Sequence, residues 1–133
     1  MPAKRIDFQD SNSKLEEAFK YFSDTSNIVF VEKDETIKDV IGNVYVLYSN
    51  NVAHYIGERL SSEIINRLND HFNGSSMGTH TKYNEITLER QKGNKVGYKV
   101  MMVSPECFRY AVETFLIQTF KTNDWNIRDK KND

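Results

Sequence analysis

The stretch VYVLYSNNVAHYIGE, residues 44–58, decides the fold of this chain. Apolar and aromatic side chains dominate residues 44–48 and 53–56, and the intervening SNNV supplies turn residues, so a β-hairpin is predicted. The hairpin carries Tyr45 in its first strand and Tyr55 in its second. Two phenols on paired strands either decorate an ordinary hairpin or take part in chemistry. The residues downstream decide between these two interpretations.

Size and composition point to one folded domain. The chain has 133 residues, of which 38% are hydrophobic and 28% charged, enough to bury a single core. No apolar run is long enough to span a bilayer, and the first residues lack the apolar core of a signal peptide. We therefore expect a cytoplasmic protein that makes no membrane contact. The single Cys107 excludes an internal disulfide and a cysteine-rich zinc site.

The charge pattern leaves nucleic-acid binding open. The net charge of −1 does not by itself indicate a nucleic-acid partner. However, the segment RQKGNKVGYK, residues 90–99, contains four cations and no acid. This segment is either a solvated turn or a loop that contacts phosphates. Its candidate DNA-binding residues are Arg90, Lys92, Lys95 and Lys99.

Hydrophobic periodicity predicts the remaining elements. Helices are expected over residues 13–24, 60–72, 81–93 and 105–120, and further strands over 27–32 and 96–103. The helix over 60–72 has an apolar stripe formed by Leu60, Ile64, Leu68 and Phe72. A small sheet covered by helices is the simplest packing of this order of elements.

Several polar residues border the apolar faces of these helices. Arg67 and His71 are four residues apart, hence on one side of the helix, where they flank its stripe. Glu113 lies beside Val112 on the last helix. Each could simply extend a long side chain into solvent. Together, the carboxylate, guanidinium, imidazoles and phenols suit phosphodiester hydrolysis better than acyl transfer; the set is Tyr45, Tyr55, Arg67, His71, His80, Glu113 and Asn126.

These residues carry a resemblance to a known family. VYVLYSNNVAHYIG followed by NRLNDHF resembles the GIY-YIG nucleases. The second signature tripeptide is intact at residues 55–57, whereas the first is degenerate and reads NVY at residues 43–45. The interval from Gly57 to Arg67 is about two residues longer than is usual, so a longer loop is expected there. His80 stands where several members have another histidine.

The closing segment VETFLIQTFKTNDWN completes the resemblance, which covers residues 42–127. The chain is similar to small stand-alone members, among them phage and restriction endonucleases. The resemblance implies an α+β fold with a small, mainly antiparallel three-stranded sheet flanked by helices. It places the nuclease domain at residues 41–133. Residues 1–40 are expected to form an N-terminal helical extension packed on this core.

The resemblance also implies a mechanism. Tyr45 would act as general base, assisted by His71, and Arg67 would stabilise the charge that develops on the phosphate. Glu113 would hold one Mg²⁺, with Mn²⁺ as an alternative ion. Tyr55 would contact the phosphate or help to position the base. Asn126 would orient Glu113 or a metal-bound water, and His80 and Arg59 are further candidates.

The implied partner is DNA, with RNA left open. A symmetric homodimer would suit double-strand cleavage and a monomer would suit nicking, and the sequence does not choose between them. A second interpretation also stays open, namely a non-catalytic module that binds nucleic acid or protein on the same fold. The degenerate first tripeptide and the acidic balance favour this alternative, whereas the set of polar residues favours the nuclease.

Overall fold

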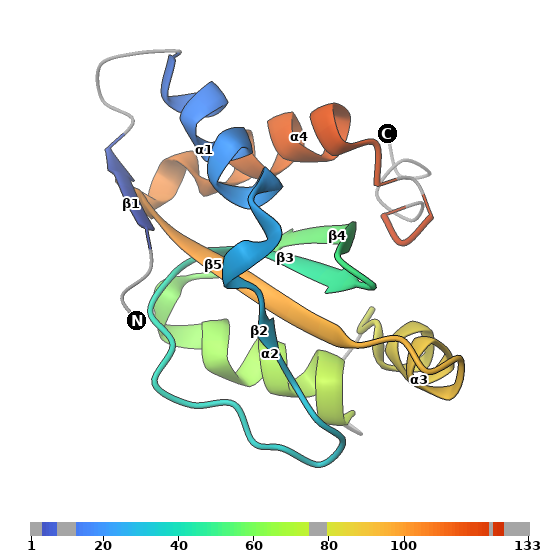
Figure 1. Ribbon diagram of the computed structural model, residues 1–133. Helices are drawn as coiled ribbons and strands as arrows, with labels where there is room; N and C mark the ends of the chain where they lie inside the picture. Colours follow the sequence, from blue (N-terminus) through green and yellow to red (C-terminus); the bar gives the residue numbers. More distant parts are fainter. Residues whose placement is uncertain (1–3, 8–12, 75–79, 123, 127–133) are drawn as a thin grey trace.

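The five strands that the structure describes belong to one mixed sheet. The computed structural model describes residues 4–7, 13–74, 80–122 and 124–126 (Figure 1). The strand order is β1-β5-β3-β4, and β2 pairs with β5 off this path. β1 runs parallel to β5, and the other pairings are antiparallel. The strands are β1 (Lys4–Asp7), β2 (Val29–Phe30), β3 (Val44–Ser49), β4 (Val52–Glu58) and β5 (Val96–Ser104).

The predicted α+β class and the hairpin are confirmed, but the sheet is larger than expected. The three strands that the resemblance implies are β3, β4 and β5. β2 lies within the strand predicted over residues 27–32, and β1 is an additional strand that the sequence analysis does not predict. Because β1 is parallel to β5, the sheet is mixed. The N-terminal segment is therefore not purely helical, since two of its strands hydrogen-bond directly to β5.

Four α-helices flank the sheet in the described part of the chain, and three of them begin later than predicted. The helices are α1 (Ser13–Ser23), α2 (Ile64–Asn73), α3 (Tyr83–Gln91) and α4 (Arg109–Phe120). A 3₁₀ turn over residues 61–63 precedes α2. A 3₁₀ turn has three residues per turn rather than 3.6, so Leu60 leaves the buried stripe and is 41% exposed. Ile64, Leu68 and Phe72 are buried as predicted.

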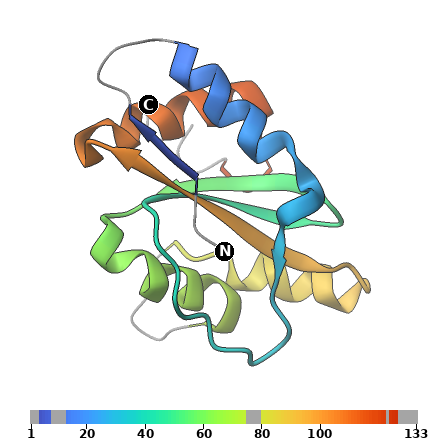
Figure 2. The same ribbon diagram turned by 60° about the vertical axis from the view of Figure 1, so that its left-hand side comes forward.

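The sheet separates two cores. Tyr45, Leu47 and Tyr55 project toward α2 and α3 on one face, whereas Val46 and Ile56 project toward α1 and α4 on the other. This is the alternation expected of a strand buried on both sides. Figure 2 shows the two helical layers on opposite faces of the sheet. The two tyrosines therefore share a face with α2, the helix that carries Arg67 and His71.

The described helices are too short or too polar to cross a bilayer.

Candidate functional site

Tyr45 occupies a space that a glycine leaves open on the neighbouring strand. Tyr45 on β3 pairs with Gly57 on β4, and the tyrosine is completely buried. A Cβ atom at position 57 would collide with Cζ and Oη of Tyr45. The intact tripeptide at residues 55–57 thus places a glycine where the phenol of the first strand must pass.

His71 connects Tyr45 to the start of α3. Its Nε2 lies 2.7 Å from Oη of Tyr45, and its Nδ1 accepts a hydrogen bond of 2.9 Å from the backbone N–H of Lys82. A backbone N–H can only donate, so Nδ1 must be the unprotonated nitrogen. The proton of a neutral imidazole then lies on Nε2, and His71 donates it to the oxygen of Tyr45.

The surroundings keep His71 neutral. Burial lowers the pKa of His71 well below its ordinary value, and the positive charges of Arg67, Lys82 and Arg59 lower it further. A neutral imidazole with its proton on Nε2 cannot accept a proton from Tyr45 at that nitrogen. The assistance that His71 can give is therefore hydrogen-bond donation to the phenol oxygen.

Opposing influences act on the phenol of Tyr45. Burial, followed by the nearby phenol of Tyr55, raises the pKa of Tyr45 well above its ordinary value. Arg67, through its charge and a hydrogen bond, and Arg59, through its charge, act in the opposite direction and lower this pKa. The neutral phenol is thus the resting form, and the two guanidinium groups favour the phenolate.

Three aromatic rings and the cationic residues Arg67 and Lys82, both largely buried, form the centre of the site. The ring centroids of Tyr45, Tyr55 and His71 lie 5.4 to 6.2 Å apart. Arg67 is 7% exposed, and its Nη2 donates to the carbonyl of His80 at 3.3 Å. The site therefore brings together four predicted residues, Tyr45, Tyr55, Arg67 and His71. His80 contacts it through its backbone, while its side chain is exposed.

Sequence reasoning missed Lys82. This residue is 8% exposed, and its Nζ lies 5.2 Å from the ring centroid of Tyr55. Its position just before α3 follows no apolar stripe, so periodicity gives no signal for it. The sole hint in the sequence is its place two residues after His80.

Arg59 lies close enough to influence both reactive rings. Its guanidinium donates to the carbonyl of Glu58 at 2.9 Å. Its charge lowers the pKa of Tyr45 and the pKa of His71, in each case after larger contributions, of which burial is the first. Arg59 therefore contributes positive charge to the site from the end of β4.

Glu113 lies on α4, which packs on the face of the sheet opposite the tyrosines. It is half-buried on α4, next to the buried Val112. α4 contacts β4, the outermost strand on that side of the sheet, on the face opposite the tyrosines. The role of Glu113 as a metal ligand stays a prediction.

The donor set of the described residues fits a weakly held, hard cation. Within that part of the chain, no group of three or more His, Cys, Asp or Glu side chains could hold a metal ion. Mg²⁺ commonly keeps several waters and binds through one or two carboxylates together with substrate phosphates. A single carboxylate, the ligand predicted at Glu113, is compatible with such an ion.

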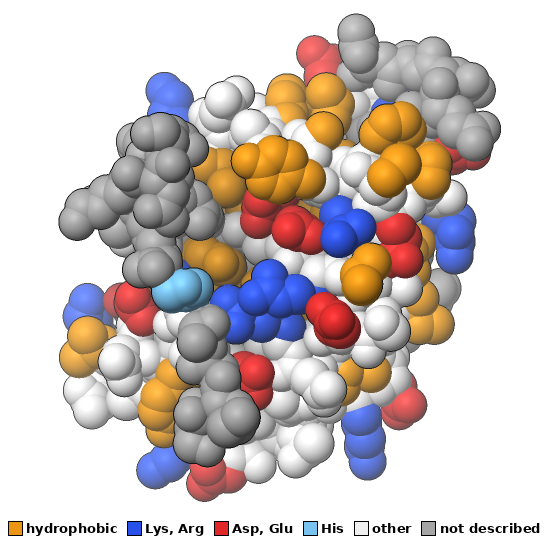
Figure 3. All heavy atoms as spheres, turned by 180° about the vertical axis from the view of Figure 1, so that it is seen from behind, with side chains coloured by type: hydrophobic (Ala, Val, Ile, Leu, Met, Phe, Trp, Pro, Cys, Tyr) orange, Lys and Arg blue, Asp and Glu red, His pale blue; other side chains and the backbone are white. Residues whose placement is uncertain are grey.

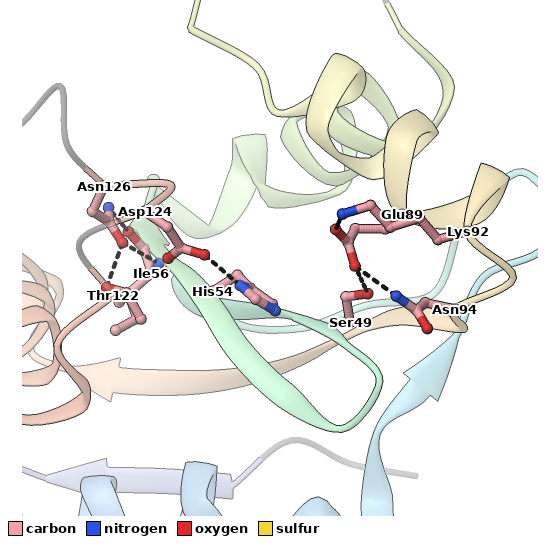
Figure 4. Close-up of polar contacts among 9 residues, drawn as sticks. All are labelled: Ser49, His54, Ile56, Glu89, Lys92, Asn94, Thr122, Asp124 and Asn126. Carbon is pink, nitrogen blue, oxygen red and sulfur yellow. Dashed lines mark hydrogen bonds and ion pairs between the residues drawn. The ribbon is translucent and has the colours of Figure 1, made fainter.

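The side chain of Asn126 hydrogen-bonds to the backbone at the outer edge of β4. Its Oδ1 accepts from the N–H of Ile56 at 3.0 Å and from Oγ1 of Thr122 at 2.6 Å, and its Nδ2 donates to the carbonyl of Ile56 at 3.1 Å (Figure 4). Asn126 thereby pairs with the backbone of β4 as a neighbouring strand would, between Tyr55 and Gly57. The predicted role of Asn126 in orienting Glu113 or a bound water stays a prediction.

A second contact near Asn126 fixes the same segment. Nδ1 of His54 lies 2.6 Å from Oδ2 of Asp124 (Figure 4), and the His54 ring stacks on Trp125 at 4.9 Å. Residues 124–126 are therefore docked along β4 through both polar and aromatic contacts. These contacts keep the edge of the sheet beside Tyr55 ordered.

The basic segment 90–99 is not one surface. Lys99 is 2% exposed, and its ammonium donates to the carbonyls of Tyr21 and Asp24 at the end of α1. The prediction that Lys99 contacts DNA is wrong, because the alternation of β5 turns this side chain inward toward α1. Its cation satisfies carbonyls that follow the helix end.

The other three cations of this segment differ among themselves. Arg90 donates to the carbonyls of Phe72 and Val31 and so ties α3 to its neighbours. Lys92 forms an ion pair with Glu89, which also accepts from Ser49 and Asn94 (Figure 4). Lys95 lies 5.7 Å from the ring of Phe30. Lys92 and Lys95 are exposed, so their contact with DNA stays a prediction, as does that of Arg90.

Comparison with known proteins identifies the family. The family model described as the GIY-YIG catalytic domain matches residues 41–127, which agrees with the range over which the sequence resembles that family. No curated protein and no solved structure matches the chain. Members of this family are generally nucleases, which act on nucleic acids and typically depend on a divalent metal. The chain belongs to the GIY-YIG family.

Proposed function

We propose that the protein is a divalent-metal-dependent endonuclease that hydrolyses phosphodiester bonds in DNA. The observation that carries this proposal is the contact between Tyr45 and His71, beside the guanidinium of Arg67. A phenol with a hydrogen-bond donor and a cation at its oxygen has the means to exist as a phenolate. Such a group can take a proton from water.

Tyr45 would act as the general base. Its phenolate would accept a proton from the water that attacks phosphorus, a step typically worth ~10²–10⁴-fold in rate. Nε2–H of His71 would stabilise that phenolate by donation, and Arg67 would stabilise it by charge. Arg67 offsets part of the effect of burial, which raises the pKa of Tyr45.

The phosphate would lie between the cations and the phenols. Arg67 would bind its non-bridging oxygens, where negative charge increases in the transition state. Tyr55 would hydrogen-bond the phosphate or help to position the base. Asn126 would hold β4, and with it Tyr55, in place through the backbone of Ile56.

Glu113 would hold the metal ion, Mg²⁺ or Mn²⁺. When bound, such an ion neutralises charge on the phosphate and on the leaving oxygen. Its single protein carboxylate leaves the remaining coordination positions to water and substrate. Removal of this carboxylate should therefore abolish turnover while leaving most of the cationic DNA-binding surface intact.

A plasmid assay tests the proposal. Supercoiled DNA is incubated with the protein in Mg²⁺, in Mn²⁺ and in EDTA, beside the variants Glu113→Ala and Gln118→Ala. Gln118 is exposed on the same helix, so its variant is a matched control. Cleavage by the wild type and by Gln118→Ala in metal, with none by Glu113→Ala, is expected. Equal cleavage by all three proteins, or cleavage in EDTA, would refute the assignment.

One observation favours the alternative of a non-catalytic binding module. Tyr45 is completely buried, and burial raises its pKa. Under the alternative, Tyr45 and His71 serve only as a polar contact of the core between β3 and α2. DNA binding without metal-dependent turnover in the plasmid assay would support this alternative over the nuclease.

A further inference from the structure

Lys82 contacts two residues of the site through different groups. Its backbone N–H donates to Nδ1 of His71 at 2.9 Å. Its ammonium lies 5.2 Å from the ring centroid of Tyr55. The side chain is therefore directed at the rings of the site, although it comes from the start of α3 rather than from the hairpin or α2.

Lys82 is a largely buried residue without an acidic partner among the described residues. Lys82 is 8% exposed, and among the residues that the structure describes no carboxylate forms an ion pair with it. The face of an aromatic ring compensates only a small part of the cost of removing a cation from water. An ammonium that lies over the Tyr55 ring and has no carboxylate beside it is suited to an anion that arrives from solution.

Three cations converge on the same imidazole. Lys82, Arg67 and Arg59 all act on His71, and no carboxylate is among the groups that influence it. Arg67 also donates to the carbonyl of His80, two residues before Lys82. Figure 3 shows Lys and Arg side chains gathered on one face of the molecule.

We infer that Lys82 is a phosphate-binding residue of the site, with its ammonium contacting a backbone phosphate of the nucleic acid beside the one held by Arg67 or a second oxygen of that same phosphate. This inference rests on the proposed function and adds a residue to it. The Tyr55 ring holds the free ammonium in place before substrate binds. The backbone of Lys82 meanwhile fixes the proton of His71 on Nε2.

Binding measurements without metal test the inference separately from cleavage. The affinity for a fluorescently labelled DNA duplex is measured by anisotropy in EDTA, over a series of salt concentrations. The proteins are the wild type, Lys82→Met, Lys82→Arg and Lys20→Met. Lys20 is exposed on α1, on the opposite face of the sheet, so its variant removes the same charge from a remote place. The methionine variant keeps the backbone N–H that bonds to His71.

Each phosphate contact contributes ~0.9 to the slope of log affinity against log salt. Lys82→Met should reduce the slope by about one, whereas Lys20→Met and Lys82→Arg should retain the wild-type slope. A wild-type slope in Lys82→Met, with the duplex still bound, would overturn the inference and leave the proposed function standing. Failure of the wild type to bind the duplex would overturn both. Circular dichroism identifies an unfolded variant, for which Lys82→Gln is the replacement.

Discussion

Nε2 of His71 lies 2.7 Å from Oη of Tyr45, and Nδ1 of the same imidazole accepts a hydrogen bond from the backbone N–H of Lys82. The direction of the hydrogen bond to Tyr45 follows from the second contact, because a ring nitrogen that accepts cannot also carry the proton of a neutral imidazole. His71 is thereby a donor to the phenol. Its expected contribution is to make the phenolate of Tyr45 easier to form.

Removal of this donor should displace the pH dependence of cleavage. A hydrogen bond to a charged group contributes about 1.5–3 kcal/mol, and 1.36 kcal/mol corresponds to one pKa unit. The rate–pH profile of His71→Ala should therefore be displaced about 1–2 units to higher pH, so that at a given pH below the pKa of Tyr45 it cleaves about 10–100-fold more slowly than the wild type. The measurement is the single-turnover cleavage rate against pH. His54→Ala, which removes the imidazole beside Asp124, serves as control and should keep the wild-type profile. An unchanged profile in His71→Ala would show that the donor does not act on the base.

The burial of His71 should also make stability depend on pH. The folded-state pKa of His71 lies well below its ordinary value because of burial and nearby cations. The unfolded chain binds a proton near pH 6.5 whereas the folded chain does not, so the free energy of unfolding should fall as pH drops below about 6.5. The expected slope is up to ~1.4 kcal/mol per pH unit. Urea unfolding at pH 7.5, 6.5 and 5.5 measures it.

The variant His71→Gln provides the comparison for this slope. It keeps a polar side chain but has no group that titrates in this range. Its free energy of unfolding should be nearly independent of pH between 7.5 and 5.5. The same slope in both proteins would assign the effect to other groups.

Lys99 should matter for stability rather than for DNA binding. Its buried ammonium donates to the carbonyls of Tyr21 and Asp24. Lys99→Met should lower the free energy of unfolding by about 1–3 kcal/mol, because these two carbonyls lose their partner. Lys92→Met, at an exposed site, should change it by less than about 0.5 kcal/mol. If Lys99→Met reduced the salt dependence of DNA binding and left stability intact, this assignment would be wrong.

Gly57→Ala should disturb the site through Tyr45. The added methyl group would collide with the phenol, and overpacking of this kind costs about 1–3 kcal/mol. A double-mutant cycle with Tyr45→Leu isolates the collision. The free energy of unfolding of the double variant should exceed the value expected from adding the two single effects, since leucine leaves room for the methyl group. Simple additivity would mean that the two residues do not clash.

Local pattern was sufficient for the parts of the fold that are contiguous in sequence. The alternation in residues 44–58 predicted the hairpin, and the four-residue spacing of Arg67 and His71 predicted that one helix side carries both. The pairing of residues 4–7 with β5 has no such signal, because it joins segments almost a hundred residues apart through backbone hydrogen bonds. A short strand of this kind is chosen by tertiary packing rather than by its own propensity.

The same limit explains the two errors about lysines. Lys99 was assigned to a surface loop on the basis of the charge of its neighbours, whereas the register of β5 places it beneath α1. Lys82 has no spacing relationship to Tyr55 or His71, and its proximity to them arises only when α3 packs against α2. The local density of positive charge in the sequence therefore did not predict which lysines lie near the site.

The central claim is that the oxygen of Tyr45 takes part in the chemistry, and removal of that one atom tests it most directly. Single-turnover cleavage of plasmid DNA in Mg²⁺ is compared for the wild type, Tyr45→Phe and Tyr110→Phe, which removes a hydroxyl from an exposed tyrosine. Tyr45→Phe should fold and bind DNA but cleave at least ~10²-fold more slowly, while Tyr110→Phe should cleave at the wild-type rate. Cleavage by Tyr45→Phe at the wild-type rate would contradict the central claim.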